Sequence, residues 1–160
     1  MDTGKILVAH KHGIYIVKFI GDVRLSLCST LDQYTDRMFE DEDFKTVIID
    51  LTETLCIDST SLGQLAKISI LYKEKFASLP TIVSTQEDIN RILKSMGFDK
   101  VFHIVQDSEP RLECLDELAI QSVDEQEMKE QVIKAHKLLM DLNDNNHAAF
   151  QDLVKSLEDN

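Results

Sequence analysis

The feature that most constrains the fold is an apolar run followed closely by a hydroxyl-rich segment and a helical pattern. Residues 47–51 read Val-Ile-Ile-Asp-Leu and predict a buried strand, because β-branched apolar residues favour strands. Residues 56–63 read Cys-Ile-Asp-Ser-Thr-Ser-Leu-Gly, and we interpret them as a polar turn that opens a helix over residues 59–76. The sequence thus places Asp58, Ser59 and Thr60 where unpaired N–H groups and the positive end of the helix dipole gather. A hydroxyl there can cap the helix or accept a phosphate.

Strand-like and helical patterns alternate through the first 120 residues. Residues 5–10 and 14–20 predict an antiparallel hairpin with His12-Gly13 at its turn. Further helices are predicted at residues 28–39, 86–96 and 109–120, and further strands at residues 81–84 and 101–105. Strands that alternate with helices imply an α/β fold in which helices pack on a mixed sheet.

Residues 121–160 predict a helical extension. Apolar residues repeat at 4-3-4-3 spacing in its first part, at Met128, Val132, Ala135, Leu139 and Leu142. Residues 143–146 break this helix, and a second apolar stripe follows over residues 149–157. A hairpin of two such helices cannot bury both stripes alone, so it must dock on the domain, on a second copy or on a partner. We therefore predict a domain at residues 1–120 and an extension at residues 121–160, and we expect a homodimer through the extension as one outcome.

Composition and charge exclude several classes of function. The formal net charge of −12 disfavours nucleic acid and anionic membranes as partners, because both repel an acidic surface. No apolar run approaches the ~20 residues of a membrane span, and no signal peptide is visible. Cys28, Cys56 and Cys114 are scattered and odd in number, which favours a reducing cytoplasm over a disulfide framework or a zinc site. Two neighbouring histidines, His10 and His12, are too few for a metal, and no cofactor fingerprint appears, so we expect neither metal nor cofactor.

The segment Asp58-Ser59-Thr60-Ser61-Leu62-Gly63 resembles the Asp-Ser-Ser/Thr-Gly-Leu-Gly signature of STAS domains, the anti-sigma factor antagonists of bacteria. The resemblance extends over about residues 5–119, where the predicted strands and helices and the segment Gly97-Phe98-Asp99-Lys100-Val101-Phe102 come in the family's order. Ser61 replaces the glycine that usually follows the hydroxyl pair. The resemblance implies a STAS-like mixed β-sheet packed by helices, to which this chain adds a C-terminal helical hairpin.

The resemblance also implies a function. In the family, the unphosphorylated protein binds an anti-sigma factor that is also a serine kinase, and phosphorylation of the serine after the aspartate releases it. That serine is Ser59 here, and Thr60 and Ser61 are fallback acceptors. The kinase would have the histidine-kinase-like ATPase fold, and a PP2C-type phosphatase would reverse the reaction. We expect the partner to bind the loop from Cys56 to Ser59 and the exposed face of the next helix. The expected contact residues are Cys56, Asp58, Ser59, Thr60, Ser61, Gln64 and Lys67.

Other interpretations stay open at this point. Ser59 can be an ordinary helix cap, and Asp58 can either cap the helix or orient Ser59 toward a kinase. A STAS subunit that scaffolds a transporter or a signalling assembly would need no phosphorylation. A small enzyme would need Asp50 and Asp58 to converge as an acid/base pair, whereas we expect Asp50 to be a local hydrogen-bond acceptor and the chain not to be an enzyme.

Overall fold

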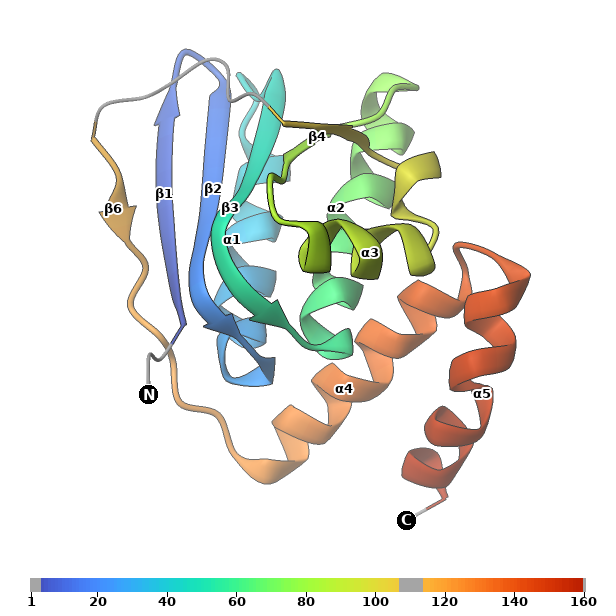
Figure 1. The fold of residues 1–160 in the computed structure, drawn as a ribbon. Helices are drawn as coiled ribbons and strands as arrows, with labels where there is room; N and C mark the ends of the chain where they lie inside the picture. Colours follow the sequence, from blue (N-terminus) through green and yellow to red (C-terminus); the bar gives the residue numbers. More distant parts are fainter. Residues whose placement is uncertain (1–3, 107–113, 160) are drawn as a thin grey trace.

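The computed structural model describes residues 4–106 and 114–159, in which helices pack on a six-stranded mixed sheet (Figure 1). The strands are β1 (Lys5–Lys11), β2 (Ile14–Val23), β3 (Thr46–Ile57), β4 (Thr81–Val83), β5 (His103–Val105) and β6 (Asp116–Glu117). The α-helices are α1 (Cys28–Glu40), α2 (Ser59–Phe76), α3 (Glu87–Ser95), α4 (Glu125–Met140) and α5 (Asp144–Glu158). Two 3-10 helices are η1 (Leu25–Leu27) and η2 (Phe98–Lys100). The strand order across the sheet is β5-β4-β3-β2-β1-β6. The predicted α/β class is therefore confirmed.

The sheet combines a hairpin with parallel crossovers. β1 and β2 pair antiparallel, and the turn between them places His12 and Gly13 at positive φ, as a tight two-residue hairpin turn requires. The pairs β2–β3, β3–β4 and β4–β5 are parallel, so a helical connection joins the two strands of each pair. The predicted hairpin and helical crossovers are thus confirmed.

Alternation along the strands divides the core into two unequal parts. Every second residue of β2 and β3 points into the main core under the helices, and these residues are Tyr15, Val17, Phe19, Val47, Ile49 and Leu51. On the opposite face, Ile16, Ile48 and Val83 form a small cluster against Leu115. The helices therefore gather mainly on one face of the sheet, where α1 and α2 lie side by side (Figure 1).

β3 is longer than the sequence predicts. The apolar run at residues 47–51 is only its first half, and the strand continues to Ile57 alongside the end of β2. Two shifts of register in β2 accommodate this pairing. Thr54 is fully buried, and its hydroxyl donates to the Phe19 carbonyl at 2.9 Å. The predicted loop from Cys56 to Ser59 is therefore wrong, because Cys56 lies in the strand and only Asp58 separates β3 from α2.

The prediction of a helix at residues 109–120 is also wrong for residues 114–120, which are the part of this range that the structure describes. Residues 109–113 lie outside the described residues, and residues 114–120 form no helix and contain β6, which pairs antiparallel with β1. Leu115 and Leu118, which suggest one helical face, pack against the two different clusters of the core. Unpaired groups of an edge strand attract a further strand, and here that tertiary pairing overrides the helical pattern.

The C-terminal hairpin docks on the domain, which was one of the three predicted alternatives. α4 packs against α2 and α5, and Figure 1 shows the hairpin beside the lower end of α2. Asn143 caps α5 by accepting from the N–H of Asn146 at 2.8 Å. The side-chain amide of Asn146 donates to the carbonyls of Met96 and Leu139, at 2.8 and 3.0 Å. The turn of the hairpin is therefore fastened to the end of α3.

Candidate functional site

Asp58 fixes the start of α2. Its backbone is extended, and one carboxylate oxygen accepts from the N–H of Ser61 at 2.8 Å, which is a helix cap. The other oxygen accepts from the N–H of Leu25 at 2.8 Å and so ties the helix to η1. Both oxygens are thus engaged by backbone donors, and the capping role weighed for Asp58 is present in the structure.

Ser59 is the first residue of α2, and its hydroxyl meets a side chain from the hairpin. The distance from Ser59 Oγ to His136 Nε2 is 2.8 Å. His136 Nδ1 lies 2.7 Å from the Val132 carbonyl, which can only accept, so Nδ1 carries a proton. In the neutral imidazole, Nε2 then accepts the hydroxyl proton of Ser59. The ring of His136 is 2% exposed and packs edge-on against Phe150.

The three adjacent hydroxyl residues differ in accessibility. Ser59 is half-buried, whereas Thr60 and Ser61 are 4% and 1% exposed. Ser61 Oγ lies 3.6 Å from Cys28 Sγ inside the domain. Burial raises the pKa of the Cys28 thiol to about 12, so this thiol stays protonated at neutral pH. Of the three predicted acceptors, Ser59 is therefore the one that a partner reaches with the least rearrangement of the domain.

Two residues of the predicted exposed face are covered by other elements. Gln64 is fully buried, and its amide donates to Gln131 of α4 at 3.0 Å. Lys67 donates to Asp32 and Asp36 of α1, at 2.6 and 2.7 Å. The expectation that Ser61 and Gln64 lie on an exposed face is thus wrong for this conformation, because α1 and α4 pack over that side of α2.

The charged groups around Lys67 stabilise one another in their ionised forms. Burial by itself lowers the pKa of Lys67, but the hydrogen bonds and charges of Asp32 and Asp36 outweigh it and raise that pKa. Burial likewise raises the pKa of Asp32, yet Lys67 and Lys134 outweigh it and hold that pKa below its usual value. The cluster is therefore ionised at neutral pH and links α1, α2 and α4.

The backbones of α2 and α4 approach closely at Gly63. A Cβ atom built on Gly63 would lie 2.3 Å from the carbonyl oxygen of Ala135 and 2.6 Å from its Cβ. Both residues are fully buried. Glycine is required at this position for α4 to reach α2, because backbone atoms of two packed helices cannot shift cheaply.

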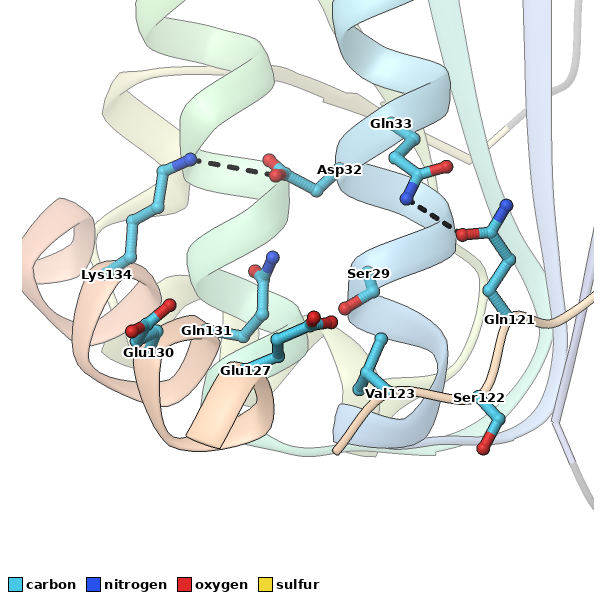
Figure 2. A pocket seen from close by; sticks show the side chains of 10 residues that line it. All are labelled: Ser29, Asp32, Gln33, Gln121, Ser122, Val123, Glu127, Glu130, Gln131 and Lys134. Carbon is cyan, nitrogen blue, oxygen red and sulfur yellow. Dashed lines mark hydrogen bonds and ion pairs between the residues drawn. The ribbon is translucent and has the colours of Figure 1, made fainter. Parts of the chain in front are cut away.

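A polar hollow of about 380 Å³ opens beside this contact, between α1, α4 and the segment that leads into α4 (Figure 2). Asp32 and Lys134 form an ion pair of 3.6 Å in its wall, and Gln33 donates to Gln121 at 2.8 Å on the other side. Glu127 and Glu130 line it from α4. The packing of α4 on the domain is therefore incomplete on this side.

Sequence reasoning did not single out His136. Its sequence signal is its place beside Ala135 and within the apolar stripe that includes Val132 and Leu139, where a histidine is more often a packed side chain than a site residue. His136 lies 77 residues after Ser59 in the sequence, and the two meet because α4 docks on α2. A local sequence pattern cannot predict such a contact.

Cys56 and the two aspartates of the enzyme hypothesis lie apart from one another. The Cys56 side chain is exposed on β3, where its thiol contacts Asp22. Asp50 accepts from the N–H and the hydroxyl of Thr52, at 2.9 and 2.6 Å, which is the local role that we expected. Asp50 lies within β3 and Asp58 just beyond its end, so roughly 25 Å of extended chain separates them. They do not form an acid/base pair.

The described part of the chain provides no group of three or more His, Cys, Asp or Glu residues that could hold a metal ion. Its helices include none with the length and apolar character to cross a membrane.

The mixed sheet packed by helices, and the helix that begins at Ser59 after the Asp58 cap, agree with the class of protein that the segment at residues 58–63 predicts. The chain belongs to the STAS domain family, whose model matches residues 5–110. No curated protein matches the chain.

Solved structures with the same fold include three that are described as anti-sigma factor antagonists. A candidate antagonist from Thermotoga maritima is 18% identical, with a TM-score of 0.56, and the match covers 64% of this chain and 86% of that one. The antagonist SpoIIAA in its unphosphorylated form is 10% identical, with a TM-score of 0.54 and coverage of 66% and 90%. An antagonist from Mycobacterium paratuberculosis is 21% identical, with a TM-score of 0.55 and coverage of 66% and 87%.

Proposed function

We propose that this chain is an anti-sigma factor antagonist whose binding to a protein partner is controlled by phosphorylation of Ser59. The observation that carries the proposal is the position of Ser59, which begins α2 directly after the Asp58 cap and is the least buried of the three adjacent hydroxyl residues. The STAS family and the kind of proteins that share its fold support the same function.

A phosphate at this position acts on binding more than on folding. It adds roughly −1.5 to −2 charges near neutral pH, together with several acceptor oxygens. The N-terminus of α2 tolerates that charge, because its unpaired N–H groups and its dipole favour anions. A partner surface that packs directly on Ser59 loses its contact and meets a desolvated charge. Phosphorylation therefore releases the partner and leaves the domain folded.

The proposed partners are proteins of the cytoplasm. The unphosphorylated chain binds an anti-sigma factor that is also a serine kinase, and a PP2C-type phosphatase restores the binding form. The proposed partner surface is centred on Cys56, Asp58 and Ser59, and Gln64 can join it only where α4 leaves α2. Thr60, Ser61 and Lys67 belong to it as residues that support the surface from inside the domain. Asp58 and Thr60 contribute by holding the start of α2, while Ser59 makes the contact that phosphorylation breaks.

The test is phosphate-affinity electrophoresis of the full chain from growing and starved cells, with mass spectrometry of the shifted band. We expect a second band in the wild type that Ser59→Ala abolishes and that Ser61→Ala keeps. Loss of the band in Ser61→Ala alone would move the acceptor to Ser61. A single unmodified band in every growth state would instead favour the alternative, a STAS subunit that scaffolds a transporter or a signalling assembly without switching.

A further inference from the structure

α4 lies on the same residues that the proposed function assigns to a partner. His136 contacts the hydroxyl of Ser59 at 2.8 Å, and Gln131 accepts from the amide of Gln64 at 3.0 Å. Between these two contacts, Ala135 packs directly on Gly63. Three successive points along the N-terminal part of α2 are thus occupied by one helix of the same chain.

We propose that α4 is an intramolecular occupant of the partner-binding face, and that it must leave α2 before Ser59 can be phosphorylated or meet a partner. This inference rests on the proposed function for the identity of that face. A kinase must align the Ser59 hydroxyl with ATP, and this hydroxyl is held by a fully packed imidazole while α4 is docked. A partner that packs flush on α2 needs the volume that Ala135 and His136 fill.

The domain is built to survive the departure of α4. Among the described residues of the main buried core, Leu139 is the one that the hairpin contributes, and all the others come from the sheet, from α1 to α3 and from their connections. Ala135 and the partly buried Leu138, Leu142 and Phe150 add apolar contacts at the margin of that core. The contacts of α4 at Ser59, at Gln64 and at Asp32 are polar, and the ion pair between Asp32 and Lys134 lies at the edge of the hollow (Figure 2). Polar groups that separate there regain water, so release costs less than the opening of an apolar core.

The contacts that α4 makes on α2 also indicate what kind of partner surface can replace it. A close approach to Gly63 requires a residue no larger than alanine on the incoming surface. The amide of Gln64 donates to α4, so the incoming surface must present an acceptor to it. The hydroxyl of Ser59 can donate to, or accept from, a polar group on that surface. A helix with a small residue, a polar group directly after it and a hydrogen-bond acceptor one turn before it meets these requirements, as Ala135, His136 and Gln131 do.

The first experiment measures access to position 59 in the full chain, without any partner. Ser59→Cys is introduced with Cys56→Ser and Cys114→Ser, and the labelling of the thiol at position 59 by a maleimide is followed by peptide mass spectrometry. Ala135→Leu, which forces α4 away from Gly63, is expected to raise the labelling rate at least tenfold. Ala149→Leu makes the same change at an exposed position of α5 and is expected to leave the rate unchanged. Equal rates in all three chains would overturn the proposal.

If Ala135→Leu does not give a cooperative thermal transition, Asn146→Ala takes its place, because it removes one of the two side-chain hydrogen bonds that hold the hairpin turn on the end of α3. Light scattering of each variant identifies the occupant. A dimer of Ala135→Leu in which the thiol at position 59 remains protected would assign the face to the hairpin of a second copy and would overturn the proposal.

The second experiment measures the fraction of phosphorylated Ser59 in cells that express the full chain with Ala135→Leu or Ala149→Leu. We expect a severalfold increase for Ala135→Leu alone. Phosphorylation of the wild type as complete and as fast as that of Ala135→Leu would overturn the control by α4 while leaving the proposed switch intact. The two experiments can also disagree. If Ala135→Leu speeds thiol labelling at position 59 but no chain carries phosphate on Ser59, the covering role of α4 is supported and the proposed switch is refuted.

Discussion

At the scale of single residues, the half-buried Ser59 begins α2, and its hydroxyl meets the buried imidazole of His136. Its place was predictable from sequence, because the change from β-branched residues to a hydroxyl-rich helix start is a local pattern. The burial of Gln64 was not predictable in the same way, since it depends on Gln131, which is 67 residues away. Local patterns thus place a site residue along the chain, whereas docking decides what covers it.

Ser59→Asp is expected to remove partner binding while the domain remains folded. A carboxylate in the first turn of α2 interacts favourably with the helix dipole, by about 0.3–1 kcal/mol, which offsets much of the lost hydrogen bond to His136. The cooperative thermal transition should therefore stay close to that of the wild type in calorimetry. Titration with the purified anti-sigma kinase should show at least a hundredfold weaker binding. Ser59→Asn is the uncharged control, and equal affinities of all three proteins would contradict the switch.

At the scale of secondary-structure elements, the connection between α4 and α5 is the best-fastened part of the hairpin. Asn143 and Asn146 both donate to the carbonyl of Met96, at 3.2 and 2.8 Å. The asparagine-rich sequence predicted a helix break here, and it also supplies the groups that bind the break to α3. Asn146 is 2% exposed, so its side chain is packed in the interior of this connection.

Asn146→Ala is expected to lower the free energy of unfolding by about 1–3 kcal/mol, because the two side-chain hydrogen bonds to the carbonyls of Met96 and Leu139 are lost. Asn145 is exposed in the same turn, and Asn145→Ala is expected to change stability by less than about 0.5 kcal/mol. Urea denaturation followed by circular dichroism measures both values. Equal effects of the two substitutions would show that the hydrogen bonds of Asn146 do not hold the hairpin.

The cluster of Asp32, Lys67 and Lys134 makes stability depend on acid pH. The pKa of Asp32 is lower in the folded chain than its ordinary value of 3.8, so its contribution to stability is complete above that value. The contribution is lost as the pH falls from about 4 through the folded pKa, because the unfolded chain binds the proton first. Asp32→Asn should lower stability at pH 7 and weaken this acid dependence in melts from pH 7 to pH 3. Asp36→Asn should do less, since Asp36 is an exposed partner; identical pH profiles for Asp32→Asn and the wild type would contradict the prediction.

Elements whose residues show a local sequence pattern were predicted better than elements that form only by pairing with a distant strand. α2 spans residues 59–76 as predicted, because its start carries a cap and its apolar residues keep helical spacing. β6 was missed, because two residues paired to a strand edge leave no periodic signal. The second half of β3 was missed for a similar reason, since Thr52, Glu53 and Thr54 interrupt the apolar run, and it is pairing with the end of β2 that continues the strand.

At the scale of the whole molecule, the chain consists of a sheet domain and a hairpin that covers its candidate binding face. The sequence predicted both parts and left three places for the hairpin to dock. An apolar stripe indicates that one face of a helix is buried, but it does not indicate which surface buries it. Ala135 and Leu139 now lie fully buried within one chain. The main apolar contacts that suggested a homodimer are thus satisfied internally, and the homodimer remains a prediction.

Removal of residues 124–160 is expected to leave a folded domain that behaves differently in solution. The strands and α1 to α3 keep their own core, while Gly63, Gln64 and the neighbouring surface of α2 become exposed. Circular dichroism should retain a cooperative thermal transition at a lower midpoint, and light scattering should show self-association or altered partner choice. Complete unfolding of the truncated chain would show that the hairpin is an integral part of the core.

The segment between β6 and α4 determines how any competitor meets α4. Residues 118–124 run from the edge of the sheet to the start of α4, and Gln121 is held on α1 by Thr30 and Gln33. A short tether of this kind keeps a detached helix at an effective concentration of about a millimolar. A free protein in a cell competes at a far lower concentration. A flexible insertion that lengthens the tether would lower the effective concentration of α4. A partner would then displace α4 from α2 at a lower concentration, although every contact residue stays the same.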